Sequence, residues 1–291
     1  TSIQSEMTDL PILQPANAAD PPSTEMTTLS NGVRVVSQET FRQCTTISAL
    51  IQVGSRYEDD ETAGCTHLIE QMAFKATENR SHAEVVGALE SIGGVPSATA
   101  SREEMVYSVD VLREHTKSAV ELLSDCVTRP KMLPEELEDS RQVVGFLLEM
   151  SRDQVSGNVQ GNVMEELTSV AFGGGSTGSS NTTTDDVNNN NNNNVMPLGR
   201  PLFYDPNEKR SSHPTVKTVK DFHANHFVGE NIVVSAAGLL HSEAVELATE
   251  YFGHVPRTSS NQKVQQKREI AKLQNNYVGG CRLVNVPDLD F

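Results

Sequence analysis

Residues 53–77 read VGSRYEDDETAGCTHLIEQMAFKAT, and this stretch determines how the rest of the chain is interpreted. An apolar run ends at Gly54, a charged segment follows, and the last part is amphipathic. Leu68, Met72 and Ala76 are each four positions apart, which places them on one stripe of a helix. The stretch therefore predicts a strand end, a charged loop and a helix from residue 64 to about residue 77.

His67, Glu70 and Gln71 stand at i, i+3 and i+4 of the predicted helix and share one of its faces. An inverted zinc helix, His-x-x-Glu-His, uses two such histidines as ligands and the glutamate as base. Here Gln71 stands where the second histidine would be. Its neutral amide is a weak zinc ligand, so zinc affinity should fall by roughly several kcal/mol.

A catalytic zinc usually has three protein ligands and a water, so a third ligand has to come from elsewhere. Glu149, in the segment FLLEM of a predicted long helix, is the candidate. Taken alone, His-x-x-Glu is more typical of a plain helical surface, and His67 could be a buried scaffold histidine. His223 and His226 form a second pair at i and i+3, with only Asp221 close by, and that pattern favours scaffold.

The remaining patterns predict helices and strands that alternate unevenly, which indicates an α+β fold with a mixed sheet. Asn31-Gly32 predicts a hairpin with a type I′ turn, because that turn needs positive φ at both central residues. The expected strands cover 27–38, 44–58, 96–112 and 231–238, and the expected helices cover 82–94, 115–130, 134 to about 150, roughly 155–171, 215–227 and 242–253.

Composition predicts the domain organisation. Residues 1–26 form an expected disordered leader, and 27–256 an expected first domain. Residues 173–196 contain seven consecutive asparagines and form an expected low-complexity insertion in that domain. The charged residues 257–275 are predicted as a linker, and 276–291 as the start of a truncated second domain.

The net charge of −16 makes nucleic acid a poor partner, since phosphate binding needs clustered Lys and Arg. A basic ligand fits better, although an acidic surface could serve solubility alone. Cys44, Cys65, Cys126 and Cys281 form no Cys-x-x-Cys pair, so we expect reduced, mostly buried thiols. No apolar run is long enough to predict a transmembrane helix.

Several segments in order resemble the pitrilysin/insulinase-type metallopeptidases. Residues 53–77 resemble their zinc-helix region, 101–112 (SREEMVYSVDVL) the strand that follows, and 129–150 the helix bearing the distal glutamate ligand, with Glu149 at its place. GRPLFYDPNE and HFVGENIVVSAAG resemble the end of the first domain. The resemblance implies a mixed, mainly antiparallel sheet covered by helices.

Within this family the chain resembles the alpha subunits of mitochondrial processing peptidases, through its degenerate zinc helix and YVGGCRLVNVP. This implies a non-catalytic, substrate-binding subunit that binds no cofactor itself, while a beta subunit carries zinc and cuts presequences. His67, Gln71 and Glu149 would then be remnant metal positions, Glu70 a remnant base, and the substrate-contacting residues unknown. The implied location is the mitochondrial matrix, with association to the inner membrane open.

The acidic balance agrees with basic amphipathic presequence peptides as partners, because these are Arg-rich and poor in acids. Two alternatives stay open at this stage. One is a structural core subunit of the cytochrome bc1 complex, since those proteins share the fold. The other is an active zinc peptidase that uses His67, Glu149 and either Gln71 or water.

Overall fold

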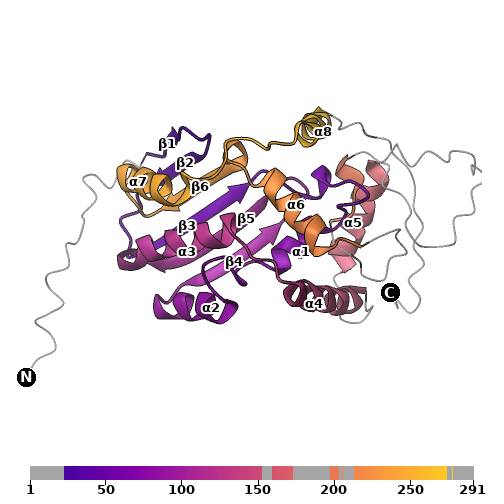
Figure 1. Ribbon diagram of the computed structural model, residues 1–291, viewed down its shortest axis with the longest axis horizontal. Helices are drawn as coiled ribbons and strands as arrows, with labels where there is room; N and C mark the ends of the chain where they lie inside the picture. Colours follow the sequence, from indigo (N-terminus) through magenta and orange to yellow (C-terminus); the bar gives the residue numbers. More distant parts are fainter. Residues whose placement is uncertain are drawn as a thin grey trace, which may run out of the picture.

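The computed structural model describes residues 23–152, 159–172, 197–202, 205, 213–273 and 277. Its centre is a six-stranded sheet (Figure 1). In spatial order the strands are β1 (Glu25–Thr28), β2 (Arg34–Gln38), β6 (Ile232–Ala237), β3 (Cys44–Ile51), β5 (Met105–Leu112) and β4 (Val95–Ala100). Only β2 and β6 pair in parallel, and the other neighbours are antiparallel. The expected α+β fold with a mixed, mainly antiparallel sheet is confirmed.

The strands bury every second residue, as expected for a sheet that packs on one face. In β3, Thr45, Ile47, Ala49 and Ile51 are fully buried, whereas Cys44 and Thr46 are exposed. β5 and β6 repeat this alternation. The buried side chains of the central strands therefore line one side of the sheet and form the core.

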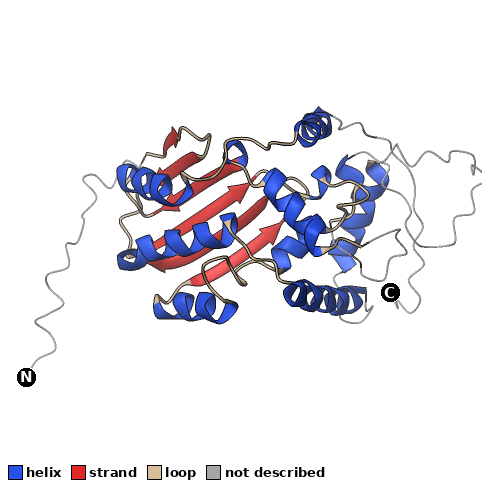
Figure 2. Cartoon of the chain, in the orientation of Figure 1, coloured by secondary structure: helices blue, strands red, loops and turns tan. Residues whose placement is uncertain are grey.

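Helices cover that buried face (Figure 2). Three of them lie across the sheet: α2 (His82–Ser91), α3 (Thr116–Thr128) and α7 (His241–Phe252). The others gather toward one end: α1 (Cys65–Gln71), α4 (Pro134–Arg152), α5 (Val159–Ala171), α6 (Val216–His226) and α8 (Gln262–Leu273). Short 3-10 turns cover Ser55–Tyr57, Arg113–His115, Pro197–Gly199 and Gly229–Asn231. No helix in the described ranges is both long and apolar enough to cross a bilayer.

The apolar stripes predicted from periodicity do face the core. Ala119, Leu122, Leu123 and Val127 of α3 are all at most 2% exposed. α2 starts as a capping box, in which Ser81 accepts from the Glu84 N–H and the Glu84 carboxylate accepts from the Ser81 N–H. Periodicity and end signals together therefore predicted these helices to within a few residues.

The prediction of a type I′ turn at Asn31-Gly32 is wrong. Asn31 is not among the residues with positive φ, and only Gly32 has one, at 89°. The chain closes instead as a longer loop in which Leu29 N donates to Val33 O and Gly32 N donates to Leu29 O. The Asn31 amide is used elsewhere, donating to the carbonyls of Phe252 and Val255. Contacts with the distant residues 252–255 thus accompany a turn conformation different from the predicted one.

Four element boundaries also differ from the sequence predictions. The expected strand 96–112 is a hairpin, because β4 and β5 are separated by the turn 101–104 in which Ser101 N donates to Glu104 O. The expected strand 44–58 ends at Ile51, and the expected helix 64–77 ends at Gln71. Phe74 has a positive φ of 56°, which the right-handed helix does not allow. β1 begins at Glu25, inside the expected leader.

The expected linker 257–275 contains helix α8. Two arginines connect this helix to the segment that follows β3. Arg268 donates to the carbonyl of Gln52, and Arg56 donates to the carbonyl of Ala271 at 2.7 Å. Arg268 also lies over the Tyr57 ring, 4.8 Å from its centroid. Whether this segment links two domains stays a prediction, and the insertion 173–196 and Cys281 lie outside the described residues. Cys44, Cys65 and Cys126 are free thiols, and the last two are buried.

Candidate functional site

Helix α1 is started by a buried acid that lies seven residues before its first residue. The carboxylate of Glu58 accepts from the backbone N–H groups of Gly64 and Thr66, both at 2.7 Å. Gly64 has φ of 91°, a left-handed conformation that suits glycine. Glu58 thus satisfies donors that the first turn of a helix leaves unpaired. Burial nevertheless raises the pKa of Glu58 to about 7.

The three residues singled out by the sequence all lie on α1. His67 is buried, and that burial lowers its pKa to about 4, so its imidazole is neutral. Glu70 and Gln71 are half-buried. Burial also raises the pKa of Glu70, while a backbone hydrogen bond from Ala100 opposes the shift. The helix therefore presents one imidazole, one carboxyl group and one amide on neighbouring positions.

Glu149 lies in α4, and α4 contacts α1, so the structure brings together the two helices that the resemblance required. The side chain of Glu149 lies outside the described residues. Among the described side chains, no group of three His, Cys, Asp or Glu residues has the arrangement of a metal site. A single imidazole beside a neutral amide does not fit the donor set of a catalytic zinc.

His223 and His226, the second histidine pair, lie on α6 in separate environments. His223 hydrogen-bonds the carbonyl of Val127 at 2.9 Å and stacks on Phe227. His226 packs against Phe222, with ring centroids 4.4 Å apart. Burial lowers the pKa of His223 to about 4 and that of His226 to about 3. These contacts agree with the scaffold interpretation of the pair.

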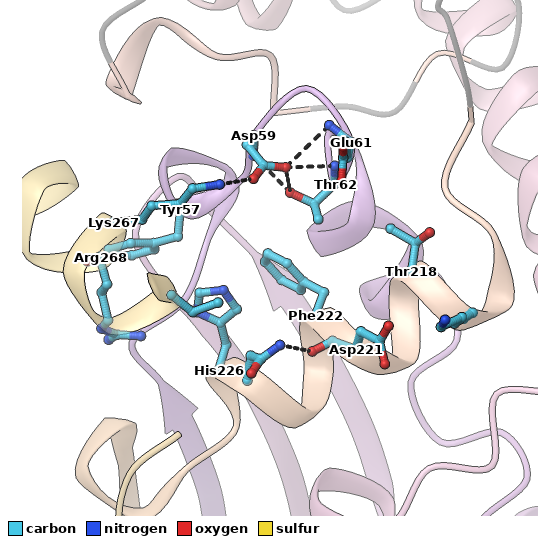
Figure 3. A pocket seen from close by; sticks show the side chains of 13 residues that line it. Tyr57, Asp59, Glu61, Thr62, Thr218, Asp221, Phe222, His226, Lys267 and Arg268 are labelled. Atoms are coloured by element: carbon cyan, nitrogen blue, oxygen red, sulfur yellow. Dashed lines mark hydrogen bonds and ion pairs between the residues drawn. The ribbon is translucent and has the colours of Figure 1, made fainter. Parts of the chain in front are cut away.

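The sequence did not point to a pocket of about 340 Å³ between α6, α8 and the loop before α1 (Figure 3). Phe222 and Tyr57 supply its ring surfaces, and an ion pair of 2.7 Å joins Asp59 to Lys267 at one side. The lining includes three acidic and three basic side chains, so the pocket favours neither sign of ligand charge. Its residues come from three distant segments, and no local pattern could have revealed them.

Two protein-family models match the chain. The model described as insulinase, peptidase family M16, matches residues 34–185, which is more than half of the chain. A second model, described as the peptidase M16 inactive domain, matches residues 214–283. The first match contains α1 and α4, the two helices that carry His67, Gln71 and Glu149.

Named relatives include both kinds of subunit of one enzyme. The chain is 29% identical over 90% of its length to the mitochondrial-processing peptidase subunit alpha of Solanum tuberosum, and 32% identical over 81% to subunit alpha-1 of Dictyostelium discoideum. It is 32% identical over 80% to subunit beta of Rattus norvegicus. The chain spans less than half the length of these relatives, at 44%, 32% and 42%.

A solved structure agrees at the level of the fold. A protease from Helicobacter pylori superimposes with a TM-score of 0.65 at 21% identity, over 84% of this chain and 52% of that one. At such an identity the likeness concerns the arrangement of helices and strands alone. Together with the match of residues 34–185, these findings show that the chain belongs to the insulinase family of peptidases, family M16.

Proposed function

We propose that this chain is a non-catalytic, substrate-binding subunit of a mitochondrial processing peptidase and acts beside a zinc-bearing partner subunit. The observation that carries the proposal is Gln71. It lies on α1 one turn from His67, where an inverted zinc helix has its second histidine. Overall similarity does not decide the subunit type, because identities to alpha and beta relatives overlap at 29–32% and 32%.

The residues at this site can bind and orient, but they lack the set needed to activate water. Zinc, when bound in the partner, lowers the pKa of water and polarises the scissile carbonyl. In this chain the neutral His67 and the half-buried Glu70 remain as polar side chains on a short helix anchored through Glu58. The proposed role is therefore to hold an extended or helical presequence for cleavage in the partner, in the mitochondrial matrix.

The charge of the chain supports a basic substrate. Presequences are amphipathic, rich in Arg and poor in acids. A protein with 23 basic and 39 acidic residues attracts such peptides over distances of about a Debye length. Attraction of this kind raises the rate of encounter more than the final affinity.

The zinc content of the purified full-length protein tests the proposal, with a Gln71→His variant measured alongside. We expect no stoichiometric zinc in the unchanged protein and about one zinc per chain in the variant, because the variant restores the missing imidazole. A presequence-cleavage assay of the same samples, with and without the partner subunit, should show activity only when the partner is present. Stoichiometric zinc in the unchanged protein, or cleavage by it alone, would contradict the proposal.

A further inference from the structure

Helix α4 exposes one continuous stripe along its length, which we call the α4 stripe. Its members recur every three or four positions and so lie on one side of the helix. The first half is acidic and the second half is apolar. The members are Glu135, Glu138, Asp139, Val143, Phe146, Leu147 and Met150, all exposed.

The apolar side chains in the second half of the stripe are unusually exposed to solvent. Val143, Phe146, Leu147 and Met150 are 46–62% exposed. Helix α5, which contacts α4, carries further exposed apolar side chains at Val163, Met164 and Leu167. Single exposed apolar residues are ordinary, whereas several on neighbouring helices mark an interaction surface.

The opposite side of α4 explains why the helix keeps this orientation. Leu137, Ser140 and Val144 are at most 3% exposed and pack into the domain. Ser140 also donates to the carbonyl of Glu136 at 2.7 Å. The helix is therefore anchored by its buried side, and the α4 stripe is not needed for that anchoring.

The acidic half carries more negative charge than the helix itself requires. Acids in a first turn stabilise the helix dipole, which accounts for Glu135. Glu138 and Asp139 lie one turn further on. Arg141 pairs with Glu138 at 3.2 Å and its second terminal nitrogen donates to the carbonyl of Pro214, so a single cation of the same helix neutralises part of the acidic half.

We propose that the α4 stripe is the docking surface for the basic amphipathic segment of a substrate peptide. The apolar side of the peptide packs on Phe146, Leu147 and their neighbours, and its cations meet Glu135, Glu138 and Asp139. The stripe spans about 22 Å at roughly 1.5 Å per residue, the length of a peptide helix of about four turns. This inference rests on the proposed function and assigns it a surface.

Fluorescence anisotropy with a labelled, synthetic, Arg-rich amphipathic peptide tests the surface, using the full-length protein in complex with its partner subunit. A Phe146→Ser/Leu147→Ser variant should weaken peptide binding about tenfold or more. A Glu135→Gln/Glu138→Gln/Asp139→Asn variant should weaken binding at low salt and flatten its salt dependence. Val86→Ser/Leu240→Ser, which alters exposed apolar residues outside α4, should bind within about twofold of the unchanged protein.

The outcomes separate this inference from the proposed function. If the unchanged complex binds the peptide and both α4 variants bind it equally well, the inference is overturned while the proposed function stands. If the unchanged complex does not bind the peptide, both fail. If the Phe146→Ser/Leu147→Ser variant loses its partner subunit in native mass measurements while the acidic variant binds peptide normally, the surface is a subunit interface and the inference is overturned. The acidic variant changes only exposed side chains, so it remains informative even if the apolar variant folds poorly.

Discussion

At the scale of single residues, buried carboxylates organise the segments around α1. Glu58 holds the helix start, and Asp125 holds the loop that follows α1. Asp125 is buried and accepts from Thr77 Oγ1 and Asn79 Nδ2, both at 2.6 Å, and from Arg80 Nη1 at 2.9 Å. These two acids differ from the exposed acids that dominate the composition, because each is surrounded by donors from its own chain.

Asp125→Ala should lower the free energy of unfolding by about 2–4 kcal/mol, because Thr77 and Asn79 lose their acceptor and the partly buried Arg80 guanidinium keeps only Glu121 as a partner. Urea unfolding followed by circular dichroism measures the change. Glu121→Ala is the matched control, since Glu121 also pairs with Arg80 but is 45% exposed. The control should cost less than about 1 kcal/mol. Equal losses in the two variants would contradict the role given to Asp125.

The raised pKa of Glu58 predicts a pH dependence of stability. The folded protein holds the Glu58 proton up to about pH 7, whereas the unfolded chain releases it near the ordinary value of 4.5. Stability from this group is therefore fully present below pH 4.5 and is lost as the pH rises to about 7, by an amount on the order of 3 kcal/mol. Unfolding titrations of Glu58→Gln should lack this component, and those of the exposed Glu61→Gln should retain it.

At the scale of elements, the reciprocal arginine contacts attach α8 to residues 52–57, which follow β3. Arg268→Ala removes both the hydrogen bond to Gln52 and the cation–π contact with Tyr57. We expect the amides of α8 to exchange with deuterium at least about tenfold faster, while those of β3 keep their protection. The exposed Lys263→Ala on the same helix should leave exchange unchanged. Unaltered protection of α8 in the Arg268 variant would show that other contacts hold it.

Local patterns correctly predicted the helices and strands whose structure is determined by their own sequence. α3 and α7 carry apolar stripes, and β6 begins with three consecutive β-branched residues. The charged sequence of α8 has no such stripe, and its packing includes hydrogen bonds from two arginines to carbonyls more than 200 positions away, which no local pattern predicts. The hairpin type failed for the same reason, because Asn31 is engaged by residues more than 200 positions away.

The positions of His67, Glu70 and Gln71 on one helix followed from their spacing alone. Their burial did not, because it depends on the packing of α1 against α4, α6 and β4. The pocket between α6 and α8 was beyond any sequence pattern, since its walls meet only after folding. The chemistry of the site was thus predictable to the extent that it resides in a single helix.

At the scale of the whole molecule, the charge of −16 should govern how basic peptides approach. Raising the ionic strength from about 0.01 M to 0.15 M shortens the Debye length from about 30 Å to about 8 Å. Association of an Arg-rich amphipathic peptide with the full-length complex should therefore slow by an order of magnitude or more, with a smaller change in dissociation. Stopped-flow measurements at several salt concentrations separate the two rates. An association rate independent of salt would contradict electrostatic attraction.

The place of β6 in the sheet bears on how the chain is made. Residues 232–237 form a strand between β2 and β3, although about 190 residues separate β2 from β6 along the chain. During synthesis, β2 and β3 leave the ribosome long before the strand that joins them. Until then each presents an unpaired edge, the feature of a nascent chain that invites association with other chains. We therefore expect folding of this chain to benefit more from a chaperone that shields strand edges than from one that accelerates collapse.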